Sequence, residues 1–231
     1  TDWIPQTTCD TEYLSHALGT MPYETVNGKI DSMHAYAYYR KATKRLILSR
    51  DHAGIKPLYY AEIPQGLVFG SEIKGIIDKV PNGRCIDDFA AAAMSYSGIN
   101  ATRNTLFKNI KKVMPGETLV YDVANKKFIG SSKQVIVPTS KSKFNAEQFR
   151  HEAHETVKMC TLGMRKFGVF LSGGLDSTLV AYELKKILGE VDSFTNEMDP
   201  NVRIGEDHND DANCAKRFAE DFGFRHHRVK V

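Results

Sequence analysis

Apolar residues follow different periods in the two halves of the chain. In the first half, short runs of apolar and β-branched residues are bounded by Gly, Pro, Asn and Lys, which is typical of antiparallel hairpins. The segment 33–51 predicts a hairpin that turns at 41–44, and a second hairpin is predicted around 64–66. Further strands are predicted at 118–121 and 128–129, and helices at 10–18, 72–77 and 86–94. The first half is therefore expected to be mostly antiparallel sheet.

From residue 145 onward, the pattern changes to an alternation of helix and strand. Asn145 is expected to cap a helix, with Gln148 at the capping-box position. The apolar residues of this helix fall on one stripe: Phe149, Ala153, Val157 and Cys160. Strands are then predicted at 169–171, 191–195 and 227–231, with helices at 178–188 and 210–222. This alternation predicts a parallel sheet with helices on its faces, and ligands bind such sheets at the carboxyl ends of the strands.

The strongest chemical signal lies at one of these strand ends, in the string SGGLDS at 172–177. A buried strand stops at Ser172, two glycines follow, and a helix restarts near Asp176. Glycines allow positive φ and a close approach of the backbone, and the N–H groups of a helix N-terminus attract anions. Ser172 and Ser177 add hydroxyl donors, and Asp176 adds a carboxylate for the magnesium that phosphates bring. The string predicts a phosphate-binding loop, and it is neither a GxxxxGK[ST] nor a GxGxxG motif.

Composition limits the classes of protein that this sequence can represent. The chain has 231 residues, 42% hydrophobic and 26% charged, which is enough for two modest cores. A net charge of +3 with interleaved acids and bases does not favour nucleic-acid binding, and no apolar run reaches the roughly 18 residues that span a bilayer. We therefore expect a cytoplasmic protein with no nucleic-acid or membrane partner. The polar, lysine-containing segment 131–143 predicts a linker between domains at 1–130 and 144–231.

Other strings are weaker candidates for chemistry. The four cysteines, Cys9, Cys85, Cys160 and Cys214, form no CxxC pair and are expected to be reduced, mostly structural thiols. The string HEAHE at 151–155 matches neither HExxH nor HxxEH, so a solvated helix face is expected. The string SEIK at 71–74 lacks the partner motifs of penicillin-binding enzymes. The acidic string at 207–211 is read as a helix N-terminus, with a cation site as the alternative.

Three strings ahead of SGGLDS carry a family resemblance. They are RDHAGIKPLYY at 50–60, GLVFGSEIK at 66–74 and VMPG at 113–116. In order and spacing they resemble strings of the glutamine-hydrolysing asparagine synthetases, and the resemblance covers nearly the whole chain. It implies part of an α+β amidotransferase domain of N-terminal-nucleophile type with antiparallel sheets. Part of an α/β parallel-sheet ATP pyrophosphatase domain would follow it.

The resemblance also implies an activity, with ATP and Mg²⁺ as cofactors. In this family glutamine is hydrolysed in the first domain, and ammonia passes through an internal tunnel to the second. There the β-carboxylate of aspartate attacks the α-phosphorus of ATP, which gives β-aspartyl-AMP and pyrophosphate, and ammonia then displaces AMP. The expected partners are therefore the small molecules aspartate, glutamine and ATP, and a homodimer is compatible with the sequence.

Site residues carry over by their place in the matching strings. Asp176 would bind magnesium, and Asp10, in the string TCDTE at 8–12, would grip the α-amino group of glutamine. The two residues before Asp10 differ from the family's Gly-Ser. The expected ATP-binding residues are Phe170, Leu171, Ser172, Gly173, Gly174, Asp176, Ser177 and Asn196.

The catalytic residues of the family have no counterpart in this chain. In the family, the glutaminase nucleophile is a cysteine at the first position of the mature protein, where this sequence has Thr1. The synthetase Glu and Lys are expected after Val231, so the chain alone is expected to be an incomplete enzyme. Two alternatives stay open. One is a relative that adenylates another carboxylate, as β-lactam synthetases and peptide cyclases do, and the other is a truncated nucleotide-binding or assembly protein without turnover.

Overall fold

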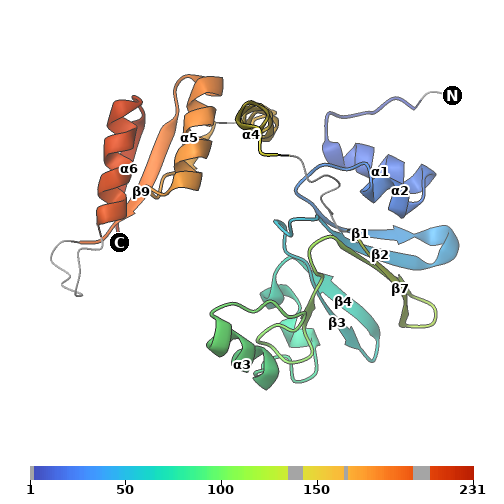
Figure 1. The fold of residues 1–231 in the computed structure, drawn as a ribbon. Helices are drawn as coiled ribbons and strands as arrows, with labels where there is room; N and C mark the ends of the chain where they lie inside the picture. The colour runs from blue at the N-terminus through green and yellow to red at the C-terminus, as the bar shows by residue number, and fades with distance from the viewer. Residues whose placement is uncertain (1–2, 135–142, 164–165, 200–208) are drawn as a thin grey trace. The chain divides into compact units, whose positions relative to one another are not determined.

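The computed structural model describes residues 3–134, 143–163, 166–199 and 209–231. The chain divides into two compact units, Thr1–Thr139 and Ser140–Val231, which we describe separately (Figure 1). Most of the predicted linker, 135–142, lies outside the described residues. Its first residues are not linker, because strand β7 (Lys127–Lys133) continues through them.

The first unit contains a four-stranded antiparallel sheet in the order β1-β2-β6-β7. The remaining strands are β1 (Ala35–Arg40), β2 (Arg45–Arg50) and β6 (Glu117–Asp122). The hairpin predicted at 33–51 is confirmed, and it turns through Lys44 at a φ of 52°. The strands predicted at 118–121 and 128–129 are confirmed as parts of β6 and β7.

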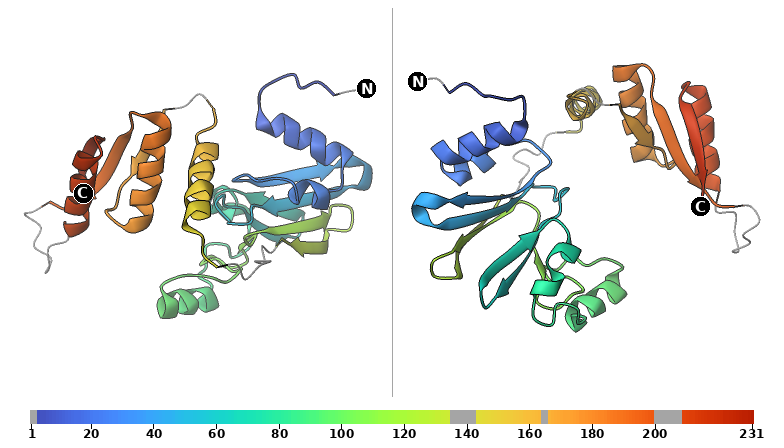
Figure 2. Two further views of the ribbon diagram at one scale, coloured as in Figure 1. Left: turned by 45° about the horizontal axis from the view of Figure 1, so that its top comes forward. Right: turned by 180° about the vertical axis from the view of Figure 1, so that it is seen from behind.

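A second antiparallel sheet packs against the first. Its order is β4-β3-β5, with β3 (Tyr59–Ile63), β4 (Gly66–Gly70) and β5 (Lys111–Lys112). The core that joins the sheets consists of Leu46, Leu48, Leu58, Tyr60, Val113, Leu119 and Tyr121. Helices α1 (Asp10–Thr20) and α2 (Tyr23–Asn27) lie beside β1 and β2, as both views in Figure 2 show, and α3 (Asp88–Ser97) follows β4 in the chain. Of these elements, α2 and β5 were not predicted.

Two of the strings that carry the family resemblance, RDHAGIKPLYY and VMPG, are joined by hydrogen bonds. Arg50 donates hydrogen bonds to the carbonyl oxygens of Gly54, Lys56 and Val113 at 2.6, 2.7 and 2.8 Å. The buried Asp51 carboxylate accepts from the N–H groups of residues 55 and 56 at 2.9 and 3.0 Å. Burial alone would raise the pKa of Asp51, but these N–H groups outweigh burial and lower it. Arg50 and Asp51 therefore fix the conformation of the loop at 51–56, and Arg50 also connects this loop to the VMPG turn.

The helix predicted at 72–77 is wrong. The segment forms two 3-10 turns, Ile73–Gly75 and Ile77–Lys79, separated by Ile76 at a φ of −120°. Ile76 and Ile77 are 4% and 9% exposed, in a core beside the second sheet. Three β-branched residues and Gly75 give this segment little intrinsic helical preference, so burial of Ile76 and Ile77 decides its shape.

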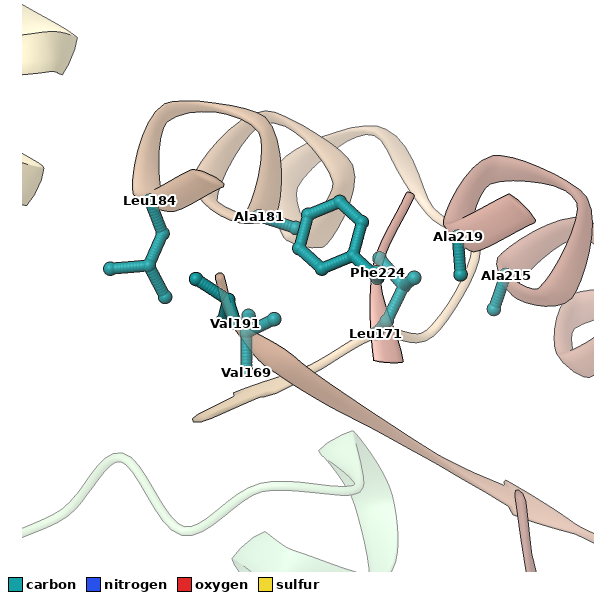
Figure 3. Packing of buried hydrophobic residues seen from close by; sticks show 8 residues of the cluster. All are labelled: Val169, Leu171, Ala181, Leu184, Val191, Ala215, Ala219 and Phe224. Atoms are coloured by element: carbon teal, nitrogen blue, oxygen red, sulfur yellow. The ribbon is translucent and has the colours of Figure 1, made fainter. Parts of the chain in front are cut away.

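The second unit is a parallel sheet in the order β10-β9-β8, which confirms the predicted alternation. Its strands are β8 (Gly168–Phe170), β9 (Asp192–Glu197) and β10 (Arg225–Lys230), and its helices are α4 (Ala146–Cys160), α5 (Leu175–Leu188) and α6 (Asp210–Asp221). Figure 3 shows the core between the strands and helices α5 and α6. It consists of Val169, Leu171, Ala181, Leu184, Val191, Ala215, Ala219 and Phe224.

Helix α4 begins as predicted but packs differently. The Asn145 side chain accepts from the N–H groups of residues 147 and 148, whereas Gln148 donates to Glu152 and closes no capping box. No residue of α4 is buried, so the predicted stripe is only partly covered. The solvated face predicted for 151–155 is wrong at His154, whose Nδ1 lies 2.7 Å from the buried carboxylate of Glu183.

Two further expectations concern the chain as a whole. The four cysteines are free thiols, as predicted, but all four are exposed and none belongs to a core. Among the described residues, no helix is long and apolar enough to cross a membrane.

Candidate functional site

The loop 172–177 joins the carboxyl end of β8 to the first turn of α5. Gly173 has a φ of +80°, and a Cβ atom there would lie 2.5 Å from the carbonyl oxygen of Asp211. Gly173 thus uses the positive φ that glycines allow, whereas Gly174 caps α5 at a φ of −77°. The helix starts at Leu175, one residue before Asp176, where the string predicted it to restart, and three residues before the predicted range 178–188. Glycine is required at position 173 because the loop presses against the first turn of α6 there.

The loop hydroxyls hold the loop together. The Oγ atoms of Ser172 and Ser177 lie 2.9 Å apart, and Ser177 Oγ donates to the carbonyl oxygen of Gly174 at 3.0 Å. Thr178 Oγ1 donates to the same oxygen at 2.7 Å, a contact that the sequence analysis missed. Ser172 Oγ also accepts from Gly174 N at 3.4 Å. In this structure the two serine hydroxyls make hydrogen bonds within the loop, whereas the sequence had predicted them as donors to a phosphate.

The free donors of the site are main-chain N–H groups of α5. The first helical hydrogen bond runs from Thr178 N to the carbonyl oxygen of Gly174 at 3.1 Å. The N–H groups of residues 175–177 precede it and have no partner within the helix. Asp176 carries an exposed carboxylate in this first turn. A helix N-terminus beside a tightly packed glycine is a suitable place for an anion.

A hollow of about 300 Å³ lies beside the loop at the strand ends. It brings together four of the predicted residues, Phe170, Leu171, Ser172 and Asn196. It is also lined by Phe194, Thr195, Asp211 and Ala212, which the sequence analysis missed. The carboxyl end of β9 was a usable signal for Thr195, whose hydroxyl donates to the carbonyl oxygen of Leu171. Gly173, Gly174, Asp176 and Ser177 form the adjoining loop rather than the wall of the hollow.

Asp10 lies apart from this loop, in the first unit. It is the first residue of α1 and lines a hollow of about 700 Å³ together with Tyr13, His34, Lys56 and Ser71. Glu12 holds the preceding segment, because its carboxylate accepts from Gln6 N and Thr7 N at 2.7 and 2.8 Å. These bonds lower the pKa of Glu12. Burial lowers the pKa of His34, which favours the neutral imidazole in the same hollow.

The donor set at the loop fits a magnesium ion carried by a nucleotide. Among the described residues no cluster of three or more His, Cys, Asp or Glu side chains could enclose a metal. Magnesium rarely needs such a cluster, since it is commonly bound by one or two carboxylates together with substrate phosphates. Asp176 supplies one carboxylate at the place where the helix N-terminus would receive the phosphates.

The protein thus has two units: antiparallel sheets form the first, and the second is a parallel sheet whose loop at 172–177 resembles a phosphate-binding loop. Comparison with family models gives the class a name. The model described as "Glutamine amidotransferase domain" matches residues 4–132, and the model described as "Asparagine synthase" matches 148–231. The chain belongs to the glutamine amidotransferase family of the asparagine synthetase kind, as its motif strings predicted.

The curated relatives support this membership at modest identity. "Asparagine synthetase [glutamine-hydrolyzing] 3" of Bacillus subtilis is 25% identical over 97% of this chain and 38% of its own length. "Asparagine synthetase [glutamine-hydrolyzing]" of Gallus gallus is 26% identical over 97% of this chain and 39% of its own length. The chain thus spans a little over a third of these relatives. A solved structure, the NH3-dependent NAD synthetase of Campylobacter jejuni, matches 38% of the chain at 22% identity, and its TM-score of 0.30 supports no conclusion about the fold.

Proposed function

We propose that the protein carrying this chain is an ATP-dependent carbon–nitrogen ligase that makes asparagine from aspartate, with glutamine as the amide donor. The family membership supports the reaction class, and the loop after β8 supports the use of ATP. In this proposal ATP activates the β-carboxylate of aspartate as β-aspartyl-AMP, and ammonia released from glutamine replaces AMP. The domains are proposed at 1–130 and 144–231, as the sequence predicts, with the first extended through Lys133, where β7 ends.

In the first unit, we assign Asp10 to glutamine. Its carboxylate is exposed on the wall of a hollow. Its Oδ1 accepts from Thr11 Oγ1 at 3.3 Å and from Cys9 Sγ at 3.7 Å, which leaves Oδ2 to accept from an ammonium group. A charge-assisted hydrogen bond of this kind is about twice as strong as a neutral one. The two antiparallel sheets are compatible with an amidotransferase domain of N-terminal-nucleophile type, which remains part of the proposal.

In the second unit, the observation that carries the proposal is the set of free N–H groups at the start of α5. These donors would hold the β and γ phosphates of ATP, and Gly173 would keep the backbone close to them. They would also stabilise the charge that develops on pyrophosphate as it leaves. Asp176 would hold Mg²⁺, which when bound neutralises phosphate charge. Phe170, Leu171 and Asn196 would border the rest of the nucleotide along the hollow.

Asp176→Ala in the whole protein tests this assignment. We expect it to abolish aspartate-dependent exchange between ATP and pyrophosphate, since loss of a metal that clamps phosphoryl oxygens costs several kcal/mol of transition-state stabilisation. Asp221→Ala is the matched control, because Asp221 is an exposed carboxylate at the far end of α6. Full exchange in Asp176→Ala would remove the metal role. Exchange that requires a carboxylate other than aspartate would replace asparagine synthesis with a related ligase reaction.

A further inference from the structure

One hollow of the first unit has no role in the proposed function. It has a volume of about 330 Å³ and lies on the face of the first sheet that points away from the core between the two sheets. Its apolar lining includes Ile47 and Val120, which are 3% and 6% exposed, and Ile129, which is 42% exposed. Arg40 and Arg45 line it as well, and we call it the outer hollow.

The two arginines of the outer hollow lie directly opposite each other. Arg40 on β1 and Arg45 on β2 are cross-strand partners, and like charges in this position destabilise a sheet. Arg40 is fixed at the carboxyl end of α1, because its Nη2 donates to the carbonyl oxygens of Leu18 and Met21 at 2.8 and 3.1 Å. Among the described residues, the guanidinium of Arg45 has no hydrogen bond and no ion pair.

The carboxylates of this region do not neutralise Arg45. Asp122 is its other cross-strand partner, but the Asp122 oxygens accept from the backbone N–H and the side-chain amide of Asn125, each at 2.9 Å. Glu24 also lines the outer hollow, and within the part of the chain that the structure describes it forms no ion pair. The guanidinium of Arg45 is therefore available to an anion from outside.

Two hairpin turns beside the outer hollow add positive charge. The β1–β2 turn lies against the β6–β7 turn, since Val123 N donates to the carbonyl oxygen of Lys44 at 3.0 Å (Figure 1). Lys44 and Lys126 have φ values of 52° and 51°, whereas the other non-glycine residues with positive φ in the described ranges are asparagines. Asparagine is common in this conformation, and lysine is disfavoured there. Both turns thus keep a cation where glycine or asparagine would fit better, with Lys41 and Lys127 close by in the chain.

We propose that the outer hollow and its two turns bind an acidic peptide segment of a partner protein. A carboxylate of the peptide would pair with Arg45 and relieve the repulsion from Arg40, and an apolar side chain would enter the hollow against Ile129. The positive turns would attract and orient such a segment. A single-stranded nucleic acid fits less well, because it stacks its bases on aromatic rings and the most exposed apolar lining residue is the aliphatic Ile129.

Fluorescence anisotropy of the whole protein with a fluorescein-labelled peptide of alternating Glu and Leu tests this proposal. A peptide of alternating Glu and Ser has the same charge without apolar side chains, and a peptide of alternating Lys and Leu reverses the charge. The Glu–Leu peptide should bind more tightly than either. Arg45→Gln should weaken it by about tenfold to about a hundredfold, as expected for loss of a hydrogen bond between charged groups. Ile129→Ser should weaken it by about threefold to about tenfold and leave the Glu–Ser peptide unchanged.

Lys79→Gln is the matched control, because Lys79 is an exposed cation of the same unit that does not line the outer hollow. It should bind the Glu–Leu peptide like the parent protein. Arg45→Gln should keep or raise the urea midpoint of unfolding, since it removes one of two opposed like charges. A lower midpoint would mean that Arg45 stabilises the sheet, and it would overturn the argument that this charge is kept for a ligand.

Poly-uridylate RNA tests the alternative class of ligand. If it binds as tightly as the Glu–Leu peptide and loses as much affinity in Arg45→Gln, the surface is a general polyanion site and the acidic-peptide proposal is wrong. Equal binding of the Glu–Leu peptide to the parent protein and to Arg45→Gln would also overturn the proposal, as would binding no tighter than that of the Lys–Leu peptide. No residue assigned to glutamine or ATP lines the outer hollow, so these outcomes leave the proposed function unaffected.

Discussion

At the scale of single residues, the two glycines of the loop have different roles. The sequence indicated only that glycines allow positive φ, and of the two only Gly173 adopts it. A run of two glycines shows that the backbone can turn sharply, but it does not show which residue bears the unusual conformation. That depends on the neighbouring helix, because Gly173 lies against the main chain of Asp211 while Gly174 takes an ordinary cap conformation.

Gly173→Ala and Gly174→Ala form a matched pair that tests this difference. Gly173→Ala should destabilise the chain by more than about 1 kcal/mol, because alanine at positive φ is strained and its Cβ would meet a carbonyl oxygen at 2.5 Å. Gly174→Ala should stay within about 0.5 kcal/mol, because its Cβ would have one contact at an ordinary 3.5 Å, to Ser172 Oγ. Urea denaturation followed by circular dichroism measures both free energies. Equal losses in the two variants would contradict this account of the loop.

At the scale of elements, a buried carboxylate joins α4 to α5. Glu183 accepts from His154 at 2.7 Å, and Lys186 lies 3.2 Å from the same carboxylate. Burial alone would raise the pKa of Glu183, but the hydrogen bonds from His154 and Lys186 outweigh it, and the pKa lies below its ordinary value. The sequence showed the helix but not this contact, because the period of a helix does not reveal which polar side chain will meet a partner from another helix.

Glu183→Gln should therefore change how stability depends on pH. A carboxyl group whose pKa is lowered by folding stabilises the folded state above its unfolded pKa, about 4.5, and this contribution is lost as pH falls through the lower folded value. At pH 7 the parent chain should be more stable than the variant by about 1.5–3 kcal/mol, the usual range for a hydrogen bond to a charged group. The difference should shrink steadily below pH 4.5.

Urea denaturation at several pH values measures this difference. Glu155→Gln is the control, because its partner Lys158 is more than half exposed and such pairs contribute at most about 1 kcal/mol. A difference between the parent chain and Glu183→Gln that stays constant from pH 7 to pH 3.5 would argue against an ionised Glu183 at the α4–α5 contact.

At the scale of the whole molecule, the sequence predicted the features that consecutive residues form. It missed contacts between residues that are distant in the chain. The change of period near residue 145 predicted antiparallel sheets followed by a parallel sheet, and both are present. The SGGLDS string located its loop because all of its parts are consecutive in the chain. The wall of the hollow was only partly predictable: Phe194 and Asp211 reach it through strand register and helix packing, neither of which leaves a short motif.

The proposal assigns glutamine recognition to the first unit and ATP binding to the second, which gives a prediction for the whole protein. Asp10→Asn should raise the KM for glutamine by about 10-fold to about 100-fold, because a hydrogen bond between charged groups contributes about 1.5–3 kcal/mol. The rate of amidation with added ammonium should be unchanged, since that reaction needs only the ATP site and the site that binds aspartate. Steady-state rates with each nitrogen donor provide the measurement.

Asp31→Asn is the control for this experiment, because Asp31 is an exposed carboxylate of the same unit that does not line the hollow of Asp10. If Asp10→Asn lowers both rates equally, the residue supports folding or the synthetase reaction and does not recognise glutamine. If it changes neither rate, the hollow beside α1 is not the glutamine site, although the assignment of the loop at 172–177 would be unaffected. A selective loss of the glutamine-dependent rate would place glutamine recognition in the first unit and activation of the carboxylate in the second.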